Sequence, residues 1–89
     1  MSKEAVVWSL PNCVQCNRTM EWLEKEGVPY SVMDLTDPEH SEDLIEFKSA
    51  GHSSAPIVEV VDNTDEVGLL NQLDIWSGFQ PEKLVEHFA

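Results

Sequence analysis

Two cysteines separated by two residues are the side chains in this sequence most suited to chemistry. Cys13 and Cys16 are the only cysteines, and Val14 and Gln15 stand between them. A bridge across so short a loop removes little entropy from the unfolded chain, so it would add little stability. A thiol pair this close can instead alternate between dithiol and disulfide forms without unfolding the rest of the chain. The spacing therefore predicts a reversible redox centre.

The two thiols are expected to differ, because the pattern predicts a helix that begins at them. Asn12 is a suitable N-cap, and Cys16, Met20 and Leu23 recur at helical spacing as one apolar stripe. The positive end of a helix favours a thiolate, whereas burial on the apolar stripe favours the uncharged thiol. We therefore expect Cys13 to be the nucleophile and Cys16 the resolving thiol.

The elements around the cysteines predict an α/β fold with the order βαβαββα. Strands are expected at 5–9, 30–35, 57–61 and 75–77, and helices from the cysteines, from Asp37-Pro38 and from Pro81. Gly27 and Gly51 are expected to end the first two helices. Residues 67–73 fit either a loop or a hairpin arm. The result is one domain over residues 1–89, a four-stranded mixed sheet with three helices on its two faces.

Pro56 is the second expected part of the site. Ala55-Pro56 directly precedes the strand predicted at 57–61. The bond could be trans, as at many strand starts, but a C-x-x-C followed by a βα unit and then by this proline favours cis. A cis bond would leave the backbone of Ala55 free to pair with a substrate chain beside Cys13.

Charge and hydropathy exclude several classes of partner. The chain has 17 acidic and five basic residues, with a net charge of −12. The basic residues are scattered, so nucleic acid is not an expected ligand. The apolar run at 5–8 is too short to cross a membrane, and no export signal precedes it, which predicts a reducing cytoplasm. The acidic balance fits either a solubilising surface or steering towards a basic partner.

Metal binding is the alternative use of the two cysteines. A closed zinc site needs four ligands, and the candidates His40, His52 and His87 are widely separated. An iron–sulfur cluster held between two chains is a further alternative. We expect no bound metal or cofactor, only the Cys13–Cys16 disulfide, and a monomeric protein.

Two motifs together resemble the NrdH-type redoxins, glutaredoxin-like proteins of the thioredoxin superfamily. They are Cys-Val-Gln-Cys at 13–16 and Trp-Ser-Gly-Phe-Gln-Pro at 76–81. The matching order of elements covers nearly the whole chain. The resemblance implies a thioredoxin-like fold and a dithiol–disulfide oxidoreductase that donates electrons to the large subunit of class Ib ribonucleotide reductase. It also implies reduction by thioredoxin reductase, so that NADPH acts only indirectly.

The resemblance also implies which residues contact the partner. Beside the thiols, these candidates are Val14, Gln15, Ala55, Pro56, Trp76, Ser77, Gly78 and Phe79. Trp76 and Phe79 could equally be core aromatics. The small Ala55 replaces a bulkier residue and should widen the substrate groove, and residues 59–74 are longer than the usual hairpin.

A glutathione-dependent glutaredoxin is the alternative within the same superfamily. Such proteins usually carry a basic residue near the first cysteine and a Gly-Gly turn after the hairpin. Here Asn12 precedes Cys13, and Trp76 to Phe79 occupy the later turn. An anionic tripeptide would also approach an acidic protein.

Overall fold

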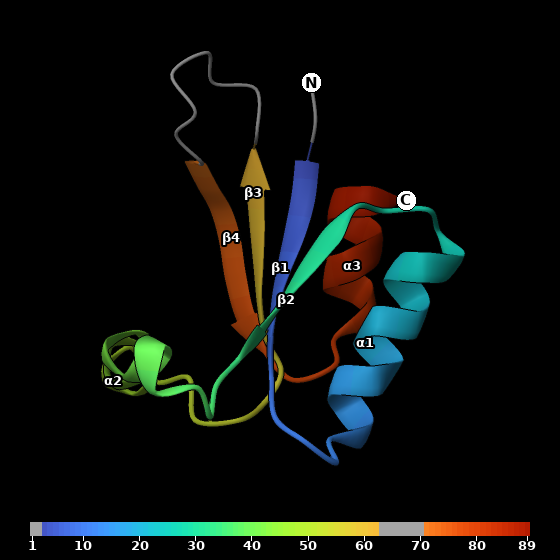
Figure 1. Cartoon of the computed structure of the whole chain (residues 1–89). Coiled ribbons are helices and arrows are strands. Elements are labelled where there is room, and N and C mark those ends of the chain that lie inside the picture. The colour runs from blue at the N-terminus through green and yellow to red at the C-terminus, as the bar shows by residue number, and fades with distance from the viewer. Residues whose placement is uncertain (1–2, 63–70) are drawn as a thin grey trace.

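The computed structural model describes residues 3–62 and 71–89 of the chain. The elements, seen in Figure 1, are β1 (Lys3–Ser9), α1 (Val14–Lys25), β2 (Tyr30–Asp34), the 3₁₀ turn η1 (Pro38–His40), α2 (Ser41–Ser49), β3 (Ile57–Asp62), β4 (Asn71–Ser77) and α3 (Pro81–Phe88). Most of the ambiguous segment 67–73 lies outside the described residues. No helix in the described part of the chain is long and apolar enough to cross a membrane.

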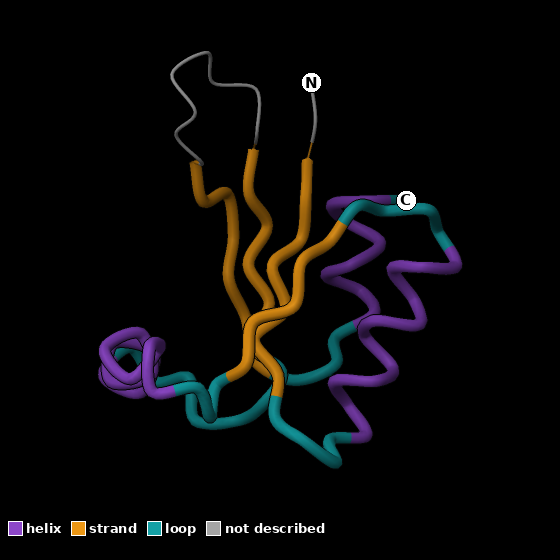
Figure 2. The backbone as a smooth tube through the Cα atoms, viewed as in Figure 1, coloured by secondary structure: helices purple, strands orange, loops and turns teal. Residues whose placement is uncertain are grey.

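The four strands form one mixed sheet in the order β2-β1-β3-β4. β1 pairs in parallel with β2, whereas β3 runs antiparallel to both β1 and β4. Helices α1 and α3 cover one face of the sheet and α2 lies on the other, as Figures 1 and 2 show. The expected mixed sheet with helices on both faces is confirmed, and the fold is thioredoxin-like.

Both faces of the central strands are buried, which explains their nearly unbroken apolar runs. Successive side chains of β1 point to opposite faces, so Val7 packs under α1 and α3 while Trp8 packs towards α2. The buried cluster on the first face contains Ala5, Val7, Leu23, Val58, Val60, Trp76 and Leu84. The smaller cluster beneath α2 contains Trp8, Leu35 and Ile57.

Local backbone geometry corrects two of the expected helix starts. Asn12 is not the N-cap of α1: it has a left-handed φ of 57°, which turns the chain so that Cys13 becomes the cap. Asp37 is a cap as expected, since its Oδ1 accepts a hydrogen bond from the N–H of Glu39, but the segment begins as a 3₁₀ turn and the α-helix starts only at Ser41. Gly27 and Gly51, both with positive φ, follow the first two helices as expected.

The last strand is longer than expected: it begins at Asn71 and pairs with β3 along its length. Asp74 interrupts the apolar pattern of β4, and for this reason the sequence predicted a strand that begins only at Ile75. Its Oδ2 lies 2.7 Å from Lys83 Nζ and 2.8 Å from His87 Nε2. The hydrogen bond from Lys83 is the largest cause of the lowering of the Asp74 pKa to about 2, and burial opposes it. The carboxylate therefore fastens the strand to the last helix.

Asp74 should make the protein less stable in acid. Because its folded-state pKa is depressed, its contribution is fully present above the ordinary pKa of 3.8 and is lost as the pH falls towards about 2. Asp74→Asn should lower the free energy of unfolding at pH 7 by about 2 kcal/mol and reduce the loss between pH 4 and pH 2. Urea unfolding at several pH values measures both. Glu82→Gln, an exposed change on α3, the helix that Asp74 contacts, is the control, and an equal effect there would contradict the prediction.

Candidate active site

Four connections meet at one end of the sheet, and Cys13 lies in one of them, directly before the helix that contains Cys16. The parallel strands β1 and β2 both end there, β3 starts there, and β4 ends there. The connecting segments are 10–13, 35–37, 50–56 and 78–80, which lie together at the lower end of the sheet in Figure 1. Residues far apart in the sequence can therefore surround the cysteines.

Cys13 and Cys16 are joined by a disulfide, with 5.2 Å between their Cα atoms. Cys13 caps α1, and its Sγ accepts a hydrogen bond of 3.1 Å from the backbone N–H of Cys16. Cys16 is only 1% exposed, whereas Cys13 is half-buried and the next residue, Val14, is 65% exposed. Cys13 is thus the sulfur that a substrate can reach more easily.

The surroundings of Cys13 suit a thiolate when the bridge is reduced. The backbone N–H of Cys16 points at its sulfur, and the first turn of α1 contains no acidic residue that would repel a negative charge. Both features favour the charged sulfur at a helix N-terminus. The pair can therefore carry out thiol–disulfide exchange.

The Ala55-Pro56 peptide bond is cis, which confirms the expectation from sequence. Pro56 is fully buried, and its carbonyl accepts a hydrogen bond of 2.7 Å from the N–H of Gly78. Within the described part of the chain, no hydrogen bond engages the backbone of Ala55. The edge beside the disulfide therefore retains a free backbone donor and acceptor.

The turn after β4 is tied to both of these segments. Gln15 Oε1 accepts a hydrogen bond of 2.9 Å from the N–H of Phe79. Ser77 Oγ lies 2.7 Å from Nδ1 of His52, in the connection that precedes Pro56. Together with the bond from Gly78 to Pro56, these contacts fix the turn against α1 and the cis proline. Gln15, placed between the cysteines, therefore joins the redox pair to the 76–81 segment.

Gly78→Ala should damage this junction. Gly78 has a φ of 82°, and a Cβ there would lie 3.1 Å from Gln15 Oε1. We expect a loss of about 1–2 kcal/mol of stability from the left-handed backbone, together with a higher KM for a protein disulfide. Gly27→Ala is a matched control, because it has a φ of 69° with nothing within 4 Å. Thermal unfolding should detect both variants, and disulfide-reduction kinetics only Gly78→Ala. Equal KM values would contradict the prediction.

The two aromatic residues of the 76–81 segment differ in burial. Trp76 is 4% exposed, belongs to the core under α1 and α3, and stacks on His87 at 5.9 Å between ring centroids. Phe79 is half-buried and packs against the same core. The position of Trp76 fits the core role that the sequence left open. Gln15, Gly78 and the backbone of Phe79 are the parts of the two motifs that meet beside the disulfide.

Sequence reasoning missed two residues of this region. The sequence offers His52 only as a candidate zinc ligand, yet its Nδ1 lies 2.7 Å from Ser77 Oγ. Leu10 is 41% exposed in the connection that leads to Cys13. Neither has a recognisable motif around it. Their roles follow from where the strands end, which no local pattern reveals.

Potential metal ligands gather away from the cysteines. In the described ranges, the one group of three such residues is Asp74, Glu86 and His87. The ammonium of Lys83 lies 2.7 Å from Asp74 and 3.8 Å from Glu86, where it competes with a cation. Among the described residues, no histidine or carboxylate completes a three-ligand group with Cys13 and Cys16.

A thioredoxin-like sheet with a Cys-x-x-Cys pair at a helix start and a cis proline beside it defines a thiol–disulfide oxidoreductase. Comparison with protein families agrees. The glutaredoxin family model matches residues 5–64, and the chain belongs to that family.

Individual relatives show how the family varies. The chain is 31% identical over 55 residues to N-acetyl-S-hydroxy-L-cysteine reductase of Bacillus subtilis (strain 168), a match that covers 62% of this chain and 58% of that protein. The structure is similar to the glutaredoxin-like NrdH-redoxin of Escherichia coli, with a TM-score of 0.71, 19% identity, and coverage of 93% and 92% of the two chains. It is also similar to a glutaredoxin of Archaeoglobus fulgidus, with a TM-score of 0.65, 28% identity, and coverage of 93% and 83%.

Proposed function

We propose that this oxidoreductase donates electrons to the large subunit of class Ib ribonucleotide reductase and is itself reduced by thioredoxin reductase. The observation that carries the proposal is the hydrogen bond between Gln15 and Phe79, which joins the two motifs typical of NrdH-type redoxins. The fold similarity to NrdH-redoxin, whose activity profile is described as thioredoxin-like, supports it. The protein would work as a monomer in a reducing cytoplasm without a resident cofactor, its electrons coming from NADPH through the reductase.

The proposed cycle uses the two cysteines in sequence. The Cys13 thiolate attacks one sulfur of the target disulfide, the other target sulfur leaves as a thiolate, and a mixed disulfide forms. Cys16 then loses its proton and attacks Sγ of Cys13, which releases the second target thiolate. Two electrons pass to the target, and the protein is left as the Cys13–Cys16 disulfide for its own reductase.

The substrate chain would lie along the cis-proline edge. Ala55 offers a free backbone N–H and C=O there, and its small side chain leaves space above them. Val14, which is 65% exposed, and Gln15 would border the substrate on the side of α1. The turn formed by Ser77, Gly78 and Phe79, which contacts Gln15, would border it there too.

The test compares reducing systems with the same disulfide substrate. Insulin reduction should proceed with NADPH and thioredoxin reductase, and should be slow with NADPH, glutathione and glutathione reductase. Activity with the glutathione system alone would overturn the proposal in favour of a glutathione-dependent glutaredoxin. Metal analysis and the visible spectrum of the purified protein test the zinc and iron–sulfur alternatives. Support of ribonucleotide reduction by the class Ib enzyme tests the partner directly.

Reduction of a small sulfenic acid is a second candidate function, favoured by the similarity to the Bacillus subtilis reductase. The Cys13 thiolate would attack the sulfenic sulfur, a proton and the hydroxyl group would leave as water, and Cys16 would release the product thiol. Turnover of N-acetyl-S-hydroxy-L-cysteine with thioredoxin reductase, compared with turnover of insulin, decides between the two substrates.

A further inference from the structure

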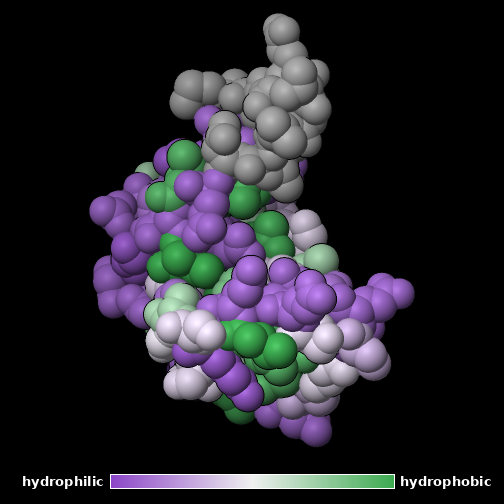
Figure 3. Space-filling model, turned by 90° about the vertical axis from the view of Figure 1, so that its left-hand side faces the viewer, coloured by the Kyte–Doolittle hydropathy of each residue, from purple (hydrophilic) through white to green (hydrophobic). Residues whose placement is uncertain are grey.

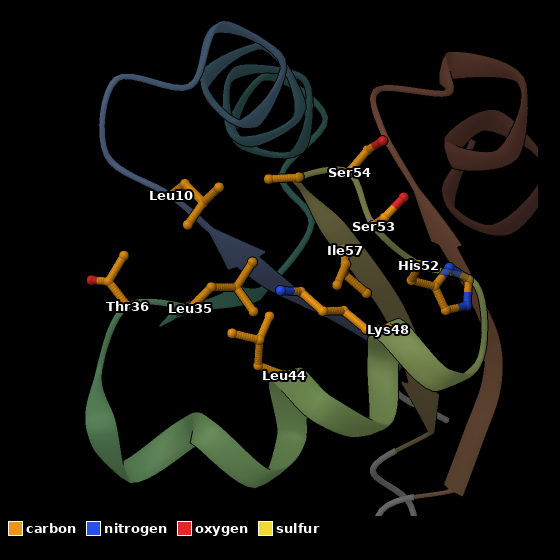
Figure 4. A pocket seen from close by; sticks show the side chains of 10 residues that line it. Leu10, Leu35, Thr36, Leu44, Lys48, His52, Ser53, Ser54 and Ile57 are labelled. Atoms are coloured by element: carbon orange, nitrogen blue, oxygen red, sulfur yellow. The ribbon is translucent and has the colours of Figure 1, made fainter.

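A pocket of about 450 Å³ opens between α2 and the end of the sheet that carries the disulfide. Its apolar lining comes from four separate segments, as the labelled side chains of Figure 4 show in part. The apolar lining residues are Leu10, Leu35, Leu44, Ala55 and Ile57. A volume of this size admits one or two side chains or a small molecule.

The pocket has a buried apolar floor and a more open rim. Leu35 and Ile57 are 6% and 2% exposed, whereas Leu10 is 41% exposed. Figure 3, which faces the side that α2 and β4 occupy, shows hydrophobic residues in its lower half bordered by hydrophilic ones. An apolar side chain entering here would bury itself without displacing any element of the fold.

The polar part of the lining carries a single full charge, which is positive. It consists of Thr36, Lys48, His52, Ser53 and Ser54. None of the ten lining residues is acidic, although the chain has 17 acidic residues. Figure 4 shows the Lys48 side chain lying across the pocket with its ammonium directed towards Leu35. No ion pair of Lys48 occurs among the described residues, so its charge is available to a partner's carboxylate.

The pocket adjoins the path that a substrate chain would follow. Ala55, which lines it, directly precedes cis Pro56 and has a free backbone. Leu10, on the opposite rim, lies in the short connection that leads to Cys13. An extended segment paired with Ala55 would therefore pass over the pocket while its disulfide lies at Cys13. This continuity favours a protein segment over an isolated small molecule as the occupant.

We propose that this pocket holds an apolar side chain of the partner's disulfide-bearing segment, while a neighbouring carboxylate of that segment pairs with Lys48. The proposal rests on the function proposed above, reduction of a protein disulfide. At long range the net charge of −12 attracts a partner with a basic surface. The pocket itself favours an acidic side chain, because Lys48 lines it. A target with an acidic, apolar segment on an otherwise basic surface would satisfy both, so the pocket acts in selection among partners.

A charge-swap experiment tests the electrostatic half of the proposal. Pre-reduced protein is mixed with two disulfide-bridged peptides that differ only in a Glu or a Lys beside a leucine flanking one cysteine. The wild-type rate constant should favour the Glu peptide about threefold, the size expected of a partly exposed ion pair. Lys48→Glu should reverse the preference. Lys25→Glu is the control, since it makes the same charge change at the far end of α1. An equal effect there would show overall charge at work and would overturn the proposal.

A second pair of variants tests the apolar half. Leu44→Ser should slow the reduction of both peptides, whereas its neighbour Ile45→Ser should not, because Ile45 is 64% exposed and does not line the pocket. Unfolding curves of both variants exclude a trivial loss of α2. Identical rates for the two variants would overturn the proposal.

Two further outcomes separate this proposal from its alternatives. If Lys48→Glu slows the reduction of cystine, a small disulfide with free carboxylates, as much as it slows the Glu peptide, the pocket binds small molecules and the proposal is wrong. Failure of the wild type to reduce either peptide would contradict the proposed function itself. Equal reduction of both peptides by every variant would contradict only the role of the pocket.

Discussion

Cys13→Ser is expected to abolish disulfide reduction. Cys13 is the more accessible sulfur, it caps α1, and its partner Cys16 is 1% exposed, so no other thiolate can reach a substrate. A serine hydroxyl at the same position is not ionised at neutral pH and cannot attack a disulfide. Turnover of insulin with thioredoxin reductase should fall to the rate measured without the protein.

The control for this variant is Asn17→Ser, an exposed change in the same turn of α1. It should retain the wild-type rate, and both variants should give the same circular dichroism spectrum because a bridge across so short a loop contributes little stability. Residual turnover by Cys13→Ser at a substantial fraction of the wild-type rate would mean that Cys16 is the attacking thiol.

Cys16→Ser is expected to stop the cycle halfway. Cys13 keeps its place at the start of α1, so attack on a target disulfide should proceed and leave a mixed disulfide. Without a resolving thiol, the mixed disulfide should accumulate to about one equivalent per protein molecule, as the two-step mechanism requires. Mass spectrometry under non-reducing conditions measures it, and dithiothreitol should release it.

A buried serine at position 16 could disturb the core, so Cys16→Ala is the companion variant. Both should trap the same species if the trap depends on the missing thiol and not on local unfolding. Full turnover with a protein disulfide in either variant would rule out Cys16 as the resolving thiol. The amount of mixed disulfide formed by a double variant, Cys16→Ser with Lys48→Glu, gives an independent measure of which partner the pocket selects.

Much of the fold was predictable because its signals are local. The run at 5–8 is apolar on both faces, which suits a central strand, and Leu23 falls on the stripe that packs beneath it. Gly27 and Gly51 mark helix ends because each adopts a positive φ. The prediction was least accurate at β4, where the local pattern is polar. The sequence predicted a strand only from Ile75, whereas the structure includes Asp74, whose carboxylate is paired with Lys83 and His87.

The candidate site was predictable only in part, for the same reason. The spacing of Cys13 and Cys16 gave the disulfide, and the position of Pro56 gave the cis bond. The side that Trp76 faces was not predictable. It lies opposite Val58 in the β3–β4 register, and both side chains point into the core under α1 and α3. A shift of one residue in that register would have placed Trp76 on the other face.

By itself, the sequence determined the chemistry. It predicted a dithiol at a helix start, two cysteines that differ in exposure, and a cis proline that precedes a neighbouring strand. These features are encoded within a few residues of one another, where spacing and propensity suffice. Only the tertiary structure decided what surrounds the dithiol. The contacts of Gln15 with Phe79 and of His52 with Ser77, and the pocket around Lys48, join segments far apart in the chain. Such contacts depend on strand order and register, which are set by the packing of the whole core.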